Sequence, residues 1–359
     1  MTERVAQRRS SGVRKAAGKA AVVLAAGVVL AGTAASAEAA PAARTAPAKP
    51  DCGGFRASAA PAVPAADRDQ APEVPPTLAG KGALSYSVAS AQAPIGLWSK
   101  AGLTLRTPVA KGTARLDVSS RGFSTDSVTV QRYEPAKHAW VDLDTRSGGG
   151  SWPHRGTFTF PVSAPKASAK HPYAVALRFQ DLDSPGTLTV NASVADGRGH
   201  TYRAPARTVT ATRPQVSVAG WANGTAKLTR GGAAQPFTIT VRNTTNRAYP
   251  ALNVNYFAYG AGKRHALTPK DLVLQQYRPG RGWEKVALTA GGCDPGMGAA
   301  LLPNRTALAP GAKAVYRLRL AVAGSAPKDV VTGDSGFSVS NGDQSFANKR
   351  LPFTIRAGK

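Results

Sequence analysis

Apolar and polar residues alternate along many short segments of the chain. Phe237, Ile239 and Val241 alternate with polar residues over positions 237–242, and residues 188–194 show the same pattern. A period of two residues with one polar side predicts antiparallel β-strands that bury one face and expose the other. Pro, Gly and Asn recur between these segments, and no helical period stands out beyond the N-terminal region. The pattern predicts an all-β protein.

A sequence repeat divides this pattern into two halves. Residues 128–135 recur as residues 272–279, and each copy is followed by a tryptophan, Trp140 or Trp283. Four more matches follow in the same order and at nearly the same offset: 148–150 with 291–292, 164–165 with 309–310, 173–179 with 316–322, and 193–197 with 338–342. An ordered series of this kind predicts two homologous domains, residues 80–212 and 213–359.

Each half has the length and strand density of a β-sandwich. Seven or eight short strands in about 130 to 145 residues are typical of an immunoglobulin-like domain. The Cys-Trp-Cys spacing of antibody domains is absent, so the expected likeness lies in the architecture alone. Trp140 and Trp283 occupy matching positions, and we expect each to anchor the core of its domain.

Residues 1–39 have the features of a secretory signal peptide. A basic segment precedes an uncharged run over residues 20–37, which ends in small residues. We expect cleavage between Ala39 and Ala40, with a second site two residues earlier as the alternative. A pair of arginines in the basic segment leaves the twin-arginine export route open beside the general one. The sequence therefore predicts a secreted, extracellular protein without stable membrane insertion once the signal is removed.

Residues 40–79 consist mostly of Ala and Pro. They hold hardly any large apolar side chain, so folding would bury too little surface to offset the loss of conformational entropy. We expect a disordered linker between the signal peptide and the first domain.

The charge of the chain points to anionic partners. The 46 Lys and Arg outnumber the 20 Asp and Glu, which gives a formal net charge of +26. Residues 1–39 hold six basic and two acidic side chains, so the mature chain keeps a charge of +22. A secreted protein of this charge is expected to adhere to anionic cell-wall polymers or other polyanions. No dense basic block is present, so dispersed charge that serves solubility alone is an equal alternative, and no specific nucleic-acid partner is indicated.

Motifs for catalysis are few. Residues 333–336 read Gly-Asp-Ser-Gly, like the nucleophile segment of chymotrypsin-like proteases, but His265 has no evident orienting partner in the sequence. The five histidines lack metal-ligand spacing, and no phosphate-binding glycine loop occurs. Five aspartates expected in loops form no calcium motif: Asp181, Asp183, Asp196, Asp334 and Asp343. We predict no catalytic residue, no metal, no cofactor and a non-enzymatic protein.

Two further binding functions stay open beside polyanion adhesion. Carbohydrate binding would use tryptophans that have no equivalent in the other half. The chief candidate contact is Trp152, in a Ser-Trp-Pro-His-Arg segment, followed by Trp98 and Trp221. Local packing of Trp152 is the competing interpretation. The other open function is that of a structural spacer that interacts with a protein partner.

Three segments of the second half form a recognisable series: residues 236–249, residues 272–277 with Trp283, and the Leu-Ala-Pro-Gly sequence at 308–311 before the strand at Tyr316. Together they resemble the immunoglobulin-like repeats of secreted actinobacterial surface proteins. The resemblance covers the second domain well and the first through the internal repeat. It implies export and a β-sandwich fold rather than a particular chemistry. Wall-anchored relatives end in a sorting signal, and we expect no covalent wall attachment here.

Cys52 and Cys293 are the two cysteines of the chain. An exported chain meets oxidising conditions, so we predict that they form one intramolecular disulfide between the linker and the second domain, with free thiols or an intermolecular bridge as the alternatives. Alkylation of the secreted protein without reductant should label no cysteine. Labelling of both cysteines would contradict the bridge.

Overall fold

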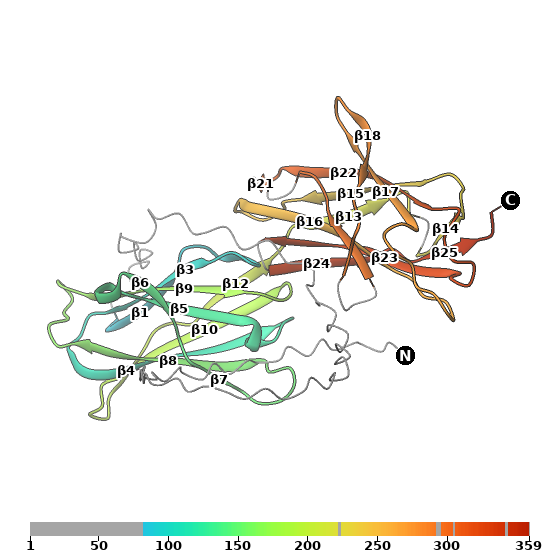
Figure 1. Ribbon diagram of the computed structural model, residues 1–359. Coiled ribbons are helices and arrows are strands. Elements are labelled where there is room, and N and C mark those ends of the chain that lie inside the picture. Colours follow the sequence, from blue (N-terminus) through green and yellow to red (C-terminus); the bar gives the residue numbers. More distant parts are fainter. Residues whose placement is uncertain (1–81, 222–223, 292–295, 304–305, 342–343, 359) are drawn as a thin grey trace, which may run out of the picture. The chain divides into compact units, whose positions relative to one another are not determined.

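The computed structural model describes residues 82–221, 224–291, 296–303, 306–341 and 344–358. The first sandwich, residues 84–212, contains two facing sheets (Figure 1). One sheet has five antiparallel strands in the order β1-β3-β9-β5-β6. Their bounds are Leu84–Val88 for β1, Ser99–Leu105 for β3, Val128–Glu134 for β5, Ala139–Asp142 for β6 and Tyr173–Asp181 for β9.

The other sheet of the first sandwich has seven strands. Six follow the order β2-β12-β10-β4-β8-β7, and β11 pairs with β10. Their bounds are Gln92–Pro94 for β2, Val109–Arg121 for β4, Thr145–Ser147 for β7, Arg155–Ala164 for β8, Gly186–Ala195 for β10, Thr201–Arg203 for β11 and Arg207–Thr212 for β12. Two short 3₁₀ turns, η2 at Thr125–Ser127 and η3 at Pro135–Lys137, flank β5.

The second sandwich, residues 215–356, repeats this arrangement. Its five-stranded sheet has the order β13-β15-β22-β17-β18: Gln215–Ala219, Gln235–Arg242, Lys313–Val322, Leu272–Arg278 and Gly282–Val286. Its eight-stranded sheet follows β14-β25-β23-β16-β20-β19, with β21 on β16 and β24 on β23. The bounds are Ala226–Thr229 (β14), Tyr249–Tyr259 (β16), Thr289–Ala290 (β19), Gly296–Ala300 (β20), Thr306–Leu308 (β21), Thr332–Asn341 (β23), Gln344–Arg350 (β24) and Phe353–Arg356 (β25).

The strand pairing is that of an immunoglobulin-like sandwich. In the first sandwich β1, β3, β9 and β5 pair as strands A, B, E and D of that fold, and β4, β10 and β12 pair as C, F and G. The first strand divides between the sheets, because β2 pairs in parallel with β12. The second sandwich shows the same parallel pairing between β14 and β25. The predicted all-β fold with two immunoglobulin-like sandwiches is confirmed.

Alternate side chains of each strand form the cores. In β8, Phe158, Phe160 and Val162 are buried while the residues between them face outward. In β15, Phe237 and Ile239 are likewise buried, as the sequence pattern predicted. Each such side chain contributes about 1.5 to 3 kcal/mol by leaving water. Because burial fixes one face of every strand, the opposite face is free to carry polar groups.

The expectation that Trp140 and Trp283 anchor the cores is wrong. Trp140 lies opposite Tyr133, and Trp283 opposite Tyr277, on the outward faces of the five-stranded sheets. Trp283 keeps 36% of its surface exposed. On the partner strands β5 and β17, the core positions belong to residues such as Val130 and Leu274, which face the opposite side of the sheet from Tyr133 and Tyr277. The predicted signal peptide with its site at Ala39 and Ala40, the predicted linker, and Cys52 and Cys293 lie outside the described residues.

Asp181 at the end of β9 is the carboxylate that burial perturbs most among the described residues. Its Oδ1 accepts hydrogen bonds from the Ser127 hydroxyl at 3.1 Å and the Asp183 N–H at 3.0 Å, while Oδ2 is buried without a partner among those residues. Burial raises the pKa of Asp181 to about 6, and the two hydrogen bonds oppose that rise.

The raised pKa of Asp181 predicts a pH dependence of stability. Between its unfolded pKa of about 4 and about pH 6, the folded chain retains a proton that the unfolded chain loses, so this group's contribution to the unfolding free energy falls as pH rises. Urea unfolding from pH 4 to 7 should show that Asp181→Asn removes this fall relative to wild type. The exposed Asp144→Asn is the control. Parallel profiles for wild type and Asp181→Asn would contradict the assignment.

Candidate functional site

A hollow of about 860 Å³ lies on the outward face of the seven-stranded sheet of the first sandwich. Strands β4 and β8 form its floor, β7 one wall, and β10 contributes at the opposite side. The lining residues are Thr113, Arg115, Asp117, Val118, Ser119, Arg146, Ser147, Gly148, Arg155, Gly156, Thr157, Thr159 and Asn191. Most carry hydroxyl, amide or guanidinium groups, so the hollow offers hydrogen-bond donors to a ligand.

One arginine of the hollow is already paired. Arg115 donates to both carboxylate oxygens of Asp117, at 2.8 and 2.9 Å from Nε. Thr157 donates to the same carboxylate at 2.7 Å. The hydrogen bond from Arg115 lowers the pKa of Asp117 against the opposing effect of partial burial. This local network holds the middle of the floor in a fixed arrangement.

The other two arginines, Arg146 on β7 and Arg155 on β8, are exposed. Among the residues that the structure describes, neither guanidinium has a carboxylate partner, and Asp117 is the only acidic residue that lines the hollow. Register places Arg146 opposite Thr157, and Arg155 opposite Ser119. Two unneutralised cations therefore stand beside hydroxyl groups at one side of a concave surface, where they can bind oxyanions.

Trp152 lies in the loop that joins these two arginine-bearing strands. The ends of the loop, Gly148 and Arg155, line the hollow. Backbone hydrogen bonds fix the loop, since Thr125 N–H donates to the Pro153 carbonyl at 2.8 Å. The Trp152 side chain is 50% exposed, so it does not pack away locally. Trp98 and Trp221, the other aromatic candidates, are partly buried.

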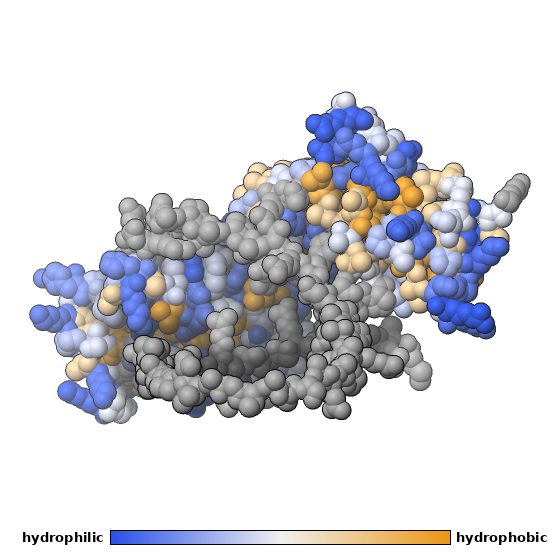
Figure 2. All heavy atoms as spheres, in the orientation of Figure 1, coloured by the Kyte–Doolittle hydropathy of each residue, from blue (hydrophilic) through white to orange (hydrophobic). Residues whose placement is uncertain are grey.

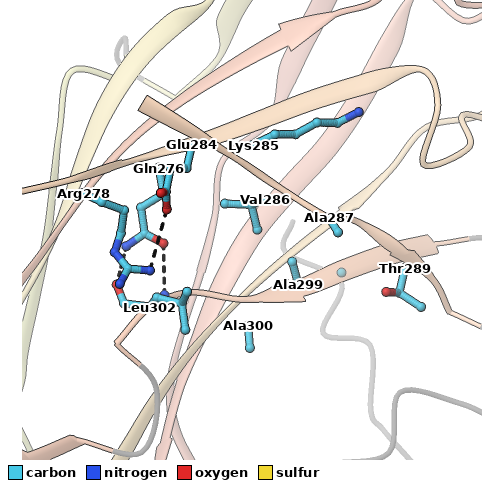
Figure 3. A pocket seen from close by; sticks show the side chains of 11 residues that line it. Gln276, Arg278, Glu284, Lys285, Val286, Ala287, Thr289, Ala299, Ala300 and Leu302 are labelled. Atoms are coloured by element: carbon cyan, nitrogen blue, oxygen red, sulfur yellow. Dashed lines mark hydrogen bonds and ion pairs between the residues drawn. The ribbon is translucent and has the colours of Figure 1, made fainter. Parts of the chain in front are cut away.

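A smaller hollow of about 320 Å³ lies in the second sandwich between the β17–β18 hairpin and β20 (Figure 3). At one end Gln276 accepts from the Leu302 N–H at 3.0 Å and donates to the Leu302 carbonyl. Arg278 lies 4.0 Å from Glu284 at the same end. Small apolar side chains such as Val286 and Ala299 line much of the rest, together with Lys285 and Thr289. Because Gln276 bonds to the backbone and Arg278 lies beside Glu284, this end of the hollow presents little chemistry to a ligand.

The repeated residues of the sequence form an aromatic and guanidinium cluster in each sandwich. In the first, the Arg178 guanidinium lies 4.3 Å from the Trp98 ring and 4.3 Å from the Trp140 ring. Arg178 also donates to the Gln131 side chain at 2.6 Å. Tyr133 contacts Trp140 edge to face, with centroids 5.6 Å apart. The arginine is thus enclosed between two indoles.

The second sandwich has the same cluster without the second indole. Arg319 lies 4.5 Å from the Trp283 ring and donates to Gln275 at 2.7 Å. Tyr277 contacts Trp283 with centroids 5.6 Å apart, as in the first copy. On the face seen in Figure 2, hydrophilic residues make up most of the projecting end of the β17–β18 hairpin. The sequence repeat identified Trp140, Trp283 and both glutamines, but alternation alone did not show which face they occupy.

The protease-like motif lies inside strand β23 rather than in a loop before it. Ser335 is fully buried, and its hydroxyl donates to the Leu351 carbonyl at 2.7 Å. A Cβ at Gly333 would lie 2.2 Å from the Phe353 ring, so this glycine serves packing. Asp334 faces Arg350 in an ion pair. The structure accounts for each of these residues by local contacts.

The expectation that His265 lacks an orienting partner is wrong. Its Nδ1 lies 2.8 Å from Asp329 Oδ1. The Arg264 N–H and the His265 ring together lower the pKa of Asp329 to about 2. His265 is exposed, and the pair fixes the turn between β16 and β17. Among the five aspartates expected in loops, Asp181 ends β9 and Asp334 lies within β23, while Asp343 is outside the described residues.

Within the described ranges, no group of three or more His, Cys, Asp and Glu side chains is arranged to hold a metal ion. The same ranges contain no helix with the length and apolar character needed to span a membrane.

No protein-family model and no curated protein matches the chain. Among solved structures, the C-terminal domain of the Streptococcus agalactiae AgI/II polypeptide BspA is 13% identical, with a TM-score of 0.37, and covers 76% of this chain and 99% of its own. A structure titled "BspA_C_mut" is 10% identical with a TM-score of 0.38, covering 77% and 99%. AvmM, which catalyses macrocyclization in alchivemycin A biosynthesis, is 13% identical with a TM-score of 0.31, covering 41% and 90%. Similarities this weak carry no argument about function.

Proposed function

We propose that the protein is a secreted, non-enzymatic binding protein that adheres to anionic cell-wall polymers through the hollow of the first sandwich. The observation that carries the proposal is the pair Arg146 and Arg155, which lie without carboxylate partners beside a hydroxyl-lined concave surface. Guanidinium groups bind carboxylate and phosphate oxygens in a forked geometry. The hydroxyl groups around them suit a ligand that itself carries hydroxyl groups.

The chemistry that this hollow recognises is an oxyanion on a hydroxylated chain. Phosphate-linked polyols and acidic polysaccharides both have it, since each repeats a negative charge between hydroxyl groups. The net charge of the chain supports the same ligand class, because an overall positive field raises the rate of association with polyanions. The signal peptide inferred from the sequence would bring the protein to the compartment where such polymers occur.

Neutral carbohydrate binding is the second candidate, and the exposure of Trp152 favours it. Half of this indole is open to solvent, in a loop whose ends line the hollow. An aromatic ring stacks on the apolar face of a sugar through short-range contact, which salt hardly screens. Trp152→Ala therefore separates this candidate from charge-driven binding.

Retention on immobilised poly(glycerol phosphate), alginate and neutral dextran tests the proposal. We expect retention on one or both anionic polymers, falling steeply between about 50 and 200 mM salt. The double substitution Arg146→Gln with Arg155→Gln should weaken binding and reduce the slope of log affinity against log salt by about 1 to 2. The two anionic columns distinguish phosphate from carboxylate recognition.

The matched control replaces two exposed arginines of the second sandwich, Arg264→Gln with Arg356→Gln, which removes the same charge elsewhere. Equal losses for the two double variants would show that net charge alone binds, and would contradict a site at the hollow. Salt-independent retention on dextran that Trp152→Ala abolishes would favour the carbohydrate candidate instead.

A further inference from the structure

The outward face of the five-stranded sheet in the second sandwich carries cations without acidic neighbours. Alternation places five basic residues on it: Arg242, Lys285, Lys313, Arg317 and Arg319. The other residues that strand phase assigns to this face are Gln, Ser, Thr, Ala, Val, Pro and two aromatics. No Asp or Glu of these described strands shares the face. The face therefore attracts polyanions.

Aromatic rings lie among these cations. Trp283 is 36% exposed and contacts Arg319, and the Arg317 guanidinium lies 5.8 Å from the Tyr277 ring. The combination of aromatic rings with arginines on one sheet face suits a ligand that is both planar and negatively charged. Single-stranded nucleic acid has both properties, because its bases stack on rings and guanidinium planes while its phosphates pair with cations.

Comparison of the two repeats locates a stacking position. In the first sandwich Lys100 lies opposite Arg178, and in the second Pro236 lies opposite Arg319. Two residues before these positions stand Trp98 and Ala234, respectively. Trp98 covers one side of its arginine, whereas Trp283 is the single ring within cation–π distance of Arg319 among the described residues.

We infer that this face binds single-stranded nucleic acid without sequence preference, and that a base stacks on Arg319 at the position that Trp98 occupies in the first repeat. The phosphates that follow this base in one direction contact Arg317 and Lys313, which lie two and six residues before Arg319 on the same face of β22. The inference goes beyond the proposed function, since it concerns a different sandwich and a different ligand. Stacking on a guanidinium plane is tolerant of base identity, which accounts for the lack of sequence preference.

Ala234→Trp tests the inference without a change of charge. The new indole should occupy the stacking position and so weaken binding of a fluorescent thymidine oligonucleotide of about 15 nucleotides by roughly fivefold or more. Binding of inorganic polyphosphate, which has no rings, should stay within about twofold of wild type. Arg319→Lys keeps the positive charge but removes the planar guanidinium group. It should likewise weaken binding of the oligonucleotide more than binding of polyphosphate. Circular dichroism melting confirms that each variant is folded.

Two controls separate this inference from the function proposed above. Trp98→Ala, at the equivalent position of the first sandwich, should leave oligonucleotide binding unchanged. Arg146→Gln with Arg155→Gln should also leave it unchanged, although it weakens binding to wall-type polymers. Failure of the oligonucleotide to bind, or equal losses for oligonucleotide and polyphosphate in both Ala234→Trp and Arg319→Lys, would overturn the inference and leave the proposed function standing.

Discussion

Each strand of the two sandwiches must bury one of its faces, and the rest of the molecule depends on this constraint. Phe158 and Phe160 of β8 point into a core, so Thr159 between them is directed outward. The same two-residue period directs Arg317 and Arg319 of β22 outward, because Leu318 and Leu320 fill the core of the second sandwich. A high content of basic residues is thereby compatible with dry cores. Part of the charge therefore lies on sheet faces rather than in loops alone, and a sheet sets the spacing of the residues along each face.

The two repeats share one cluster of side chains and differ in the residues around it. A glutamine, a tyrosine, a tryptophan and an arginine make the same contacts in both, with the arginine to glutamine distances at 2.6 and 2.7 Å. The first repeat adds Trp98, which encloses its arginine, and the second has Ala234 at that place. The loop beside the hollow at Arg146 and Arg155 differs as well, since Trp152 also has no equivalent in the second repeat. One duplicated scaffold thus carries two different surfaces.

The fold could be predicted from the sequence because its signals are local or repeated. Alternation identified β10 and β15, and the repeat placed β5 and β17 in equivalent positions. The sequence did not show on which face of the sheet Trp140 and Trp283 lie, because tryptophan occurs on either face of a strand. Their pairing with Tyr133 and Tyr277 determines the face.

The candidate site was less accessible to sequence analysis. Arg146 and Arg155 belong to separate strands that become neighbours only through the β7–β8 pairing, and alternation does not specify strand partners. The contact between the His265 ring and the Asp329 carboxylate joins residues 64 positions apart, and sequence analysis missed it for the same reason. The exposure of Trp152 could be suspected from the Pro, His and Arg that follow it, but the hydrogen bond at Pro153 that fixes its loop could not.

Arginine-selective modification with phenylglyoxal, read out by peptide mass spectrometry, tests the central claim most directly. The claim is that a polyanion occupies the hollow of the first sandwich. Saturating poly(glycerol phosphate) or alginate should protect Arg146 and Arg155 from modification, while Arg264 and Arg356, exposed in the second sandwich, should react at the rate seen without polymer. Equal protection of all four arginines, or none at Arg146 and Arg155 while the polymer is bound, would contradict the account.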